Sequence, residues 1–287
     1  MPRFKFLAGT CYFLCLFMVI TTSCKPKKFV YKSPPHYDFG QPVEFKLDIL
    51  IKEISGVIWD THKNQFIAHN DEKPQVYFLD RGAGTIMGAP FVFNESKGDY
   101  EDIAMINEDI YVLRSDGAIF KIAMDSTGKR HSSDLGKIGL SDKNDFETLY
   151  YDPEIKALVM LCKNCGSDDK KTVSAFAYYP DSIGFVTTPL YQIDAAKIKE
   201  LSPRETSKFQ PSSARVHPVL KKLFIISSAS NQLVIAGTNG EVEGVYMLAK
   251  KLFPQPEGLT FKSNGEMFIA NEGVTSKATL LKFIYTP

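Results

Sequence analysis

Tyr100-Glu101-Asp102-Ile103 is one of five copies of a short phrase that recurs along the chain. The other four copies are Ile54-Ser55-Gly56-Val57, Phe146-Glu147-Thr148-Leu149, Pro211-Ser212-Ser213-Ala214 and Pro256-Glu257-Gly258-Leu259. A second alternating run ends 14 to 16 residues after each copy, as Tyr111-Val112-Leu113-Arg114-Ser115 does here. Turn residues such as Asn107-Glu108-Asp109 separate the two runs. Each copy therefore opens a hairpin of two strands.

The spacing of the copies predicts the architecture. Positions 55, 101, 147, 212 and 257 are separated by steps of 46, 46, 65 and 45 residues, which is the length of a four-stranded propeller blade. The last unit supplies three strands, ending with 279–285, and one strand candidate, 43–50, precedes the first copy. Pairing these two segments would close the ring and remove its open edges. We expect an all-β fold, a single five-bladed β-propeller of four-stranded antiparallel blades.

The 65-residue step leaves an alternative of six blades. A sixth blade needs roughly 40 further residues, whereas this step exceeds the others by about 20. Residues 194–201 within it have the pattern of a short helix. We therefore interpret the excess as an insertion in one loop.

The N-terminus has the pattern of a bacterial secretion signal. Arg3 and Lys5 precede a nearly apolar run, 6–20, which is shorter than the roughly 20 residues that span a bilayer. Cys24 follows Thr21-Thr22-Ser23 and resembles the acylated cysteine of a lipobox, although Thr21 stands where Leu is usual. A plain secretory signal or an uncleaved anchor is the alternative. We expect a lipoprotein signal peptide (1–23), a lipid-tethered linker without packed structure (24–41) and the propeller domain (42–287).

The net charge of the chain indicates which kinds of partner the protein can bind. Without residues 1–23 the chain has a net charge of −1, so nucleic acid is not an expected partner. The basic segment 25–28 would instead lie against anionic headgroups beside a lipid anchor. We expect the protein at the periplasmic side of the outer membrane.

Cys162 and Cys165 have the CxxC spacing of a redox pair or half a zinc site, but no second pair completes four ligands. A local disulfide or two inert thiols are favoured.

Several phrases resemble the SdiA-regulated (YjiK-like) family of bacterial β-propellers. They are Lys97-Gly98-Asp99-Tyr100-Glu101-Asp102-Ile103-Ala104, Asp109-Ile110-Tyr111-Val112-Leu113-Arg114-Ser115-Asp116-Gly117, Asp145-Phe146-Glu147 and Pro254-Gln255-Pro256-Glu257-Gly258-Leu259. The resemblance implies a secreted or membrane-attached protein and no particular activity. The chain is also similar, more distantly, to the gluconolactonase and regucalcin group, whose Glu-Gly-Pro strand starts place a metal-binding glutamate in the channel. Glu257-Gly258 matches that start, but Ser55-Gly56 lacks the acid and no Pro follows either Gly.

The repeat predicts where polar side chains meet. In a propeller the first strand of each blade lines the central channel and begins on the face where the second strand ends. Two polar rings should therefore share one mouth. The first consists of Ser55, Glu101, Glu147, Ser212 and Glu257, and the second of Asn70, Ser115, Lys163, Ser228 and Glu272.

Three converging carboxylates repel one another, which leaves several interpretations of the first ring. Some acids stay protonated, or Lys163 or Arg114 pairs with them, or a cation sits between Glu101, Glu147 and Glu257. Oxygen ligands favour Ca²⁺ or Mg²⁺. Alternatively, Glu and Ser at the strand starts bond the backbone N–H groups of the next blade and stitch the ring together.

Two classes of function are consistent with these patterns. The first is a membrane-tethered binding or scaffold lipoprotein whose channel mouth or loop face takes a small molecule or a protein. The second is a metal-dependent esterase or lactonase, in which Glu101, Glu147 and Glu257 hold the cation. Proton transfer in such an enzyme would fall to one of four residues near the mouth, namely Asp71, Asp116, His69 and Lys163.

Overall fold

The computed structural model describes residues 1, 29–82, 84–94, 96–140, 144–166, 168, 171–273 and 276–287. The chain divides into two units, 1–30 and 31–287, and the second is the compact body described below. The expected signal peptide, apart from Met1, and Cys24 lie outside the described residues. Among the residues described, no helix is long and apolar enough to cross a membrane.

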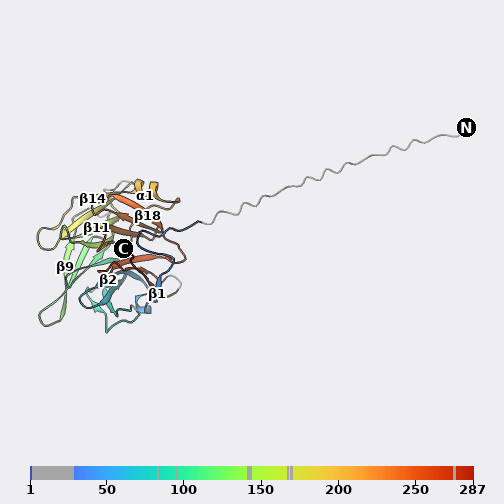
Figure 1. The fold of residues 1–287 in the computed structure, drawn as a ribbon. Coiled ribbons are helices and arrows are strands. Elements are labelled where there is room, and N and C mark those ends of the chain that lie inside the picture. The colour runs from blue at the N-terminus through green and yellow to red at the C-terminus, as the bar shows by residue number, and fades with distance from the viewer. Residues whose placement is uncertain are drawn as a thin grey trace. The chain divides into compact units, whose positions relative to one another are not determined.

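Five antiparallel sheets make up the body (Figure 1). Blade 1 is β2 (Ile54–Asp60), β3 (Gln65–Asn70), β4 (Gln75–Leu79) and β5 (Phe91–Val92). Blade 2 is β6 (Tyr100–Ile106), β7 (Asp109–Arg114), β8 (Ala118–Met124) and β9 (Arg130–Lys137). Blade 3 is β10 (Asp145–Asp152), β11 (Ala157–Asn164), β12 (Thr172–Tyr179) and β13 (Gly184–Phe185). Blade 4 is β15 (Ser213–Val216), β16 (Leu223–Ser227), β17 (Gln232–Ala236) and β18 (Val242–Met247).

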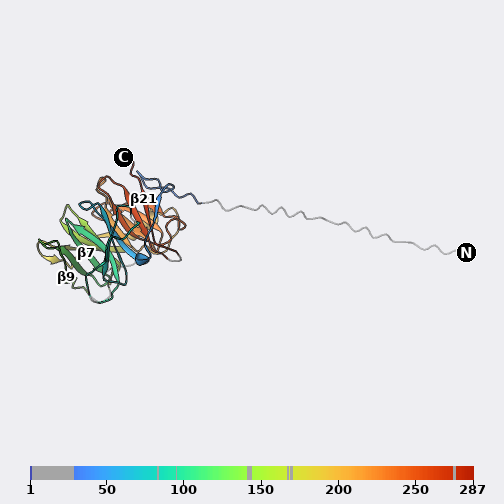
Figure 2. The ribbon, with the colours of Figure 1, turned by 90° about the horizontal axis from the view of Figure 1, so that it is seen from below.

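Blade 5 is built from both ends of the body, as predicted. Its strands are β19 (Pro256–Phe261), β20 (Met267–Asn271), β21 (Thr279–Phe283) and, from the N-terminal side, β1 (Val43–Lys46). β1 pairs antiparallel with β21, which Figure 2 shows near the C-terminus. The predicted closing strand extended to residue 50, whereas β1 ends at Lys46 and the short 3₁₀ turn η1 (Ile49–Ile51) follows. This pairing covers the outer edge of β21 and makes β1 the outer strand of blade 5.

The first strands of the blades form a closed inner ring. β2 contacts β6, and the contacts continue through β10, β15 and β19 back to β2. The ring has five members, so the fold is the predicted five-bladed β-propeller, and the six-bladed alternative is wrong.

The long step of the repeat holds an insertion, as expected. After β13 the chain adds β14 (Tyr191–Asp194), which pairs with β12 as an extra edge segment, and then α1 (Ala195–Leu201). The side chain of Asp194 caps α1 by accepting hydrogen bonds from the backbone N–H groups of Ala196 and Lys197, which satisfies free donors of the first turn. Figure 1 shows α1 beside β18, with which it is in contact.

Apolar side chains fill the space between neighbouring blades. Five buried clusters lie between consecutive blades around the ring, and the one between blades 5 and 1 includes Phe66 and Phe268 at 1% and 2% exposure. Burial of this apolar area is the main driving force that holds the blades together. All five clusters lie within residues 31–287, so this unit has a buried core of its own.

The segment expected to be an unpacked linker is partly packed. Tyr37 and Phe39 are buried in the cluster between blades 4 and 5. The Tyr37 hydroxyl donates to the Gly265 carbonyl at 2.6 Å and lies 2.6 Å from Nε2 of His217. The prolines of this segment had suggested a linker, whereas its two aromatic side chains attach it to the propeller.

Cys162, in β11, forms a disulfide with Cys165, just after the strand. This is one of the two arrangements favoured from the CxxC spacing. Both residues belong to the buried cluster between blades 2 and 3.

Candidate functional site at the acidic channel mouth

A bulge in the first strand presents the predicted ring to the channel. In four blades the register between the first two strands skips one residue, and the skipped residues are Ser55, Glu101, Glu147 and Glu257. A bulged residue has no partner across the ladder, and the strand bends there. The repeated phrase therefore marks the same bulge in these four blades.

The bulged glutamates line one open pocket of about 240 Å³ at the mouth of the channel. The pocket is lined by eight carboxylates and a single ammonium group, that of Lys163 on β11. Glu101 and Glu147 are 9% and 7% exposed. One carboxylate oxygen from each of Glu101, Asp145 and Glu147 lies within 4.8 Å of the other two. The two strand starts thus bring three acids to one point.

The sequence interpretation missed a second set of acids in the same pocket. Glu53, Asp99 and Asp145 line it, and each stands two residues before a member of the first ring. Because residues two apart in a strand lie on the same face, the period of the strand could have located them. Glu272, from the second predicted ring, and Asp71 also line the pocket.

Burial and mutual repulsion raise the pKa values of the three glutamates. Burial first, and then the charges of Glu147 and Asp99, raise the pKa of Glu101 to about 10. Burial raises the pKa of Glu257 to about 8 and that of Glu147 to about 7. In the case of Glu147, the hydrogen bond and the charge of Lys163 oppose that rise. At neutral pH the cation-free pocket therefore retains protons.

Lys163 and Ser228 partner two of these glutamates. Lys163 forms a hydrogen-bonded ion pair with Glu147. Burial lowers the pKa of Lys163, but its contacts with Glu147 and the nearby acids outweigh that effect and raise it. The Ser228 and Gln255 side chains hydrogen-bond Glu257 and oppose the rise in its pKa. One lysine cannot neutralise eight carboxylates.

The two serines of the first ring join adjacent blades. The Ser55 hydroxyl donates to the Glu101 carbonyl, and the Ser212 hydroxyl donates to the Pro256 carbonyl, both at 2.8 Å. Hydrogen bonds between blades were expected here. The serines make them to backbone carbonyl groups, whereas the expected partners were backbone N–H groups. The glutamate copies have their carboxylates in the pocket.

Four predicted ring members are not among the residues that line the pocket. They are Ser212, Asn70, Ser115 and Ser228. The Asn70 amide instead donates to the Leu50 carbonyl at 2.8 Å. Arg114, considered as a partner for the acids, forms an ion pair with Asp116. The second predicted ring is therefore represented at the mouth by Lys163 and Glu272 and by the contact of Ser228 with Glu257.

Of the four residues considered for proton transfer, some line the acidic pocket and others do not. Asp71 and Lys163 line the pocket. Asp116 pairs with Arg114 and does not line it. His69 is fully buried, and burial lowers its pKa to about 4. Asp71 and Lys163 are thus the two candidates at the acidic mouth.

Below the mouth, a buried arginine fills the centre of the ring, and the sequence interpretation did not anticipate it. Arg215 on β15 donates to both carboxylate oxygens of Asp102 on β6 at 3.0 and 2.9 Å. The same guanidinium donates to backbone carbonyls from four blades, those of Val57, Ile103, Leu149 and Ala214. These four carbonyls occupy one position of the repeat, two residues after the first-ring residue of each blade. We call Arg215 and Asp102 the central pair.

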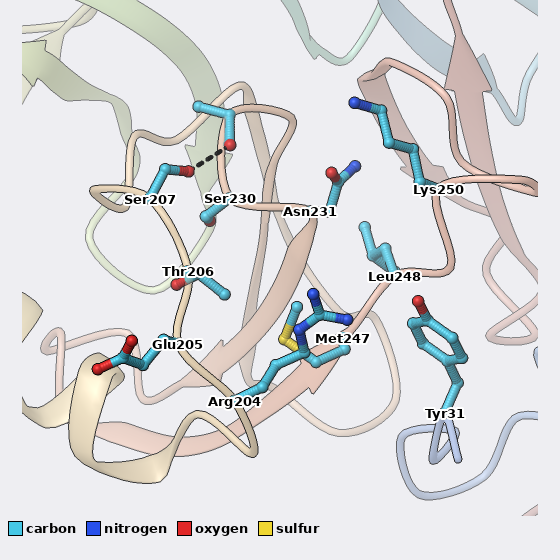
Figure 3. A pocket seen from close by; sticks show the side chains of 11 residues that line it. Tyr31, Arg204, Glu205, Thr206, Ser207, Ser230, Asn231, Met247, Leu248 and Lys250 are labelled. Atoms are coloured by element: carbon cyan, nitrogen blue, oxygen red, sulfur yellow. Dashed lines mark hydrogen bonds between the residues drawn. The ribbon is translucent and has the colours of Figure 1, made fainter. Parts of the chain in front are cut away.

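A separate pocket of about 400 Å³ lies beside blade 4 and is shown in Figure 3. Arg204, Asn231 and Lys250 surround it, and Glu205 points away from it (Figure 3). Tyr31, from the segment expected to be a linker, lines another side. The side chains of Arg204 and Lys250 are exposed, so this is an open surface depression.

Comparison with known protein families matches residues 37–274 to one family, which covers most of the propeller. The chain belongs to the SdiA-regulated family. A comparison with curated protein sequences finds no match. Membership of the SdiA-regulated family agrees with the resemblance carried by the repeated phrases.

Two similar solved structures with TM-scores above 0.5 support the fold of this SdiA-regulated propeller, and a third is more distant. Glutaminyl cyclase from Myxococcus xanthus is 13% identical, with a TM-score of 0.54 over 85% of this chain and 96% of that one. A luciferin-regenerating enzyme is 10% identical, with a TM-score of 0.51 over 85% of this chain and 95% of that one. A gluconolactonase from Xanthomonas campestris is 13% identical, with a TM-score of 0.47 over 82% of this chain and 76% of that one.

Proposed function

We propose that this SdiA-regulated propeller is a binding module whose acidic mouth holds a divalent cation, Ca²⁺ or Mg²⁺. The observation that carries the proposal is the convergence of Glu101, Asp145 and Glu147, whose oxygens lie within 4.8 Å of one another. Carboxylate oxygens are the ligands that these hard cations prefer. A bound cation would also offset the repulsion that raises the pKa values of the glutamates.

The same cation would give the module a means of binding a ligand. Ca²⁺ takes six to eight oxygen ligands, more than three carboxylates acting singly provide. The open positions would face the mouth and accept carboxylate, hydroxyl or carbonyl oxygens of a small molecule or a protein loop. Lys163, at the edge of the pocket, adds a donor for such a group.

Calorimetric titration of residues 31–287 with Ca²⁺ and with Mg²⁺ tests this proposal. We expect one equivalent of at least one of these cations to bind after treatment with a chelator. Glu101→Gln and Asp145→Asn should each weaken binding at least tenfold, because each removes a charged ligand. Glu241→Gln is the matched control, since Glu241 is exposed and lies outside the pocket.

Two outcomes would contradict cation binding. One is the absence of a stoichiometric heat with either ion, and the other is equal affinity in Glu101→Gln and Glu241→Gln. If a cation binds, a panel of esters and lactones assayed with and without it separates binding from hydrolysis. Metal-dependent turnover that Asp71→Asn abolishes would favour the hydrolase as the second candidate function.

We further propose that Cys24 is lipidated and holds the propeller at the periplasmic side of the outer membrane. The sequence around Cys24 supports this, together with the basic residues that follow it. A Cys24→Ala variant of the full chain should move from the membrane fraction to the soluble periplasmic fraction. Cys11→Ala is the control, because Cys11 lies within the expected signal peptide. Continued membrane attachment of Cys24→Ala would contradict the proposal.

A further inference from the structure

The opposite mouth of the channel carries an apolar ring that the acidic site does not use. Four residues after each ring position of the repeat, every blade contributes a half-buried apolar or aromatic side chain. These five side chains are Trp59, Met105, Tyr151, Val216 and Phe261, and all line one cavity. Half-buried apolar residues from every blade around one cavity, three of them aromatic, differ from the scattered single apolar residues that are normal at a protein surface.

Strand geometry places this cavity away from the acidic mouth. A strand rises about 3.3 Å per residue, so four residues separate the two rings by about 13 Å. The central pair lies between them, because Asp102 and Arg215 stand one and three residues after the first-ring residues of their blades. Its bonds to carbonyls from four blades fill the middle of the channel. The apolar ring is therefore the wall of a separate cup.

The cup has the size and lining of a small-molecule site. Its volume is about 400 Å³, within the range of roughly 300–1,000 Å³ for ligand pockets, which are mainly apolar with a few polar groups. Both charged residues that line it, Arg215 and Lys221, are cations.

One of the two cations offers accessible donors to a ligand. Arg215 is 9% exposed, its Nε is buried, and its other nitrogens donate to Asp102 and to backbone carbonyls. Its guanidinium therefore forms part of the floor of the cup. Lys221 is exposed on the β15–β16 turn at the rim of the cup.

We propose that this cup binds a small amphipathic anion, with a flat apolar body against the aromatic ring and an acidic group toward Lys221. An aromatic carboxylate or sulfonate has this chemistry. The body packs against Trp59, Tyr151 and Phe261, where aromatic contacts add to the area buried. The site needs neither a cation at the acidic mouth nor the residues that would hold one.

Fluorescence offers a direct test, because Trp59 is the single tryptophan of the chain. The probe is 8-anilinonaphthalene-1-sulfonate, and residues 31–287 are titrated with it in the absence of detergent. We expect one molecule to bind and to accept excitation energy from Trp59, which quenches the tryptophan emission. Lys221→Gln should weaken this binding about three- to fivefold, the effect of an exposed ion pair. Lys250→Gln, at the pocket of Figure 3, should leave it unchanged.

The neutral analogue N-phenyl-1-naphthylamine separates the two parts of the proposal. It should bind with equal affinity to the unchanged protein and to Lys221→Gln, since it lacks the sulfonate. Met105→Gln, which keeps the side-chain length, should weaken both probes alike, and thermal unfolding checks that this variant folds. Adsorption of several dye molecules without quenching of Trp59 would overturn the proposed cup. Equal affinity of the sulfonate for Lys221→Gln and Lys250→Gln would overturn the role of Lys221.

Discussion

Replacing Arg215 with Leu should lower the free energy of unfolding by about 3–5 kcal/mol, because it leaves the Asp102 carboxylate buried without its partner. Asp102 has no exposed surface. Burial already raises its pKa, and the Arg215 charge and hydrogen bonds oppose that rise. The substitution also removes the donor shared by carbonyls of four blades. Urea unfolding, followed by circular dichroism, measures the change.

A second variant distinguishes the central pair from general loss of packing. The double variant Arg215→Leu with Asp102→Leu removes both charges and should recover part of the loss, since an apolar pair can replace a buried ion pair. Recovery should be incomplete because the four carbonyls remain without the guanidinium. Arg204→Leu is the control at an exposed arginine. A loss below about 1 kcal/mol in Arg215→Leu would show that the central pair contributes no more than a surface ion pair.

The fold could be predicted from the sequence because the repeat records the same local geometry five times. The position of Glu101 in its phrase predicts the start of β6, and the same alignment predicts the starts of the other inner strands. The strand count also predicted that residues near Val43 would complete the last blade. The packing of Tyr37 and Phe39 could not be predicted in this way, because they stand outside the repeat and their partners are far away in sequence.

The acidic mouth was only partly predictable. Glu101, Glu147 and Glu257 were found because they share one position of the repeat, whereas Asp99 and Asp145 required the two-residue period of the strand as well. Arg215 gave no such signal, since the other copies have Ile, Ala, Tyr and Thr at its position. A single long side chain can reach the centre of the ring from one blade, and a repeat pattern does not indicate which blade supplies it.

The cation-free propeller should become less stable as the pH rises from about 5 to 9, because its acidic mouth binds protons more tightly than the unfolded chain does. Glu101 has a folded pKa of about 10 against 4.5 for the ordinary group, and Glu257 and Glu147 are raised to about 8 and 7. A group with a raised pKa in the folded state contributes stability below its unfolded value and loses it as the pH passes its folded value. The loss should therefore begin above pH 4.5 and continue through pH 7 to 10. Each unit of pKa shift corresponds to about 1.4 kcal/mol, so even part of these shifts is measurable.

Urea unfolding at pH 5.5, 7.0 and 8.5 in the presence of a chelator measures this trend. Glu101→Gln should flatten it, because the neutral amide keeps the shape of the protonated acid and does not ionise. Glu241→Gln should leave the trend unchanged. Saturating Ca²⁺ should stabilise the protein most at pH 8.5, since a cation competes with fewer protons there. A cation-free protein whose stability rises steadily from pH 5.5 to 8.5 would show that these glutamates are ionised in the folded state, and that their charges are already balanced without a metal.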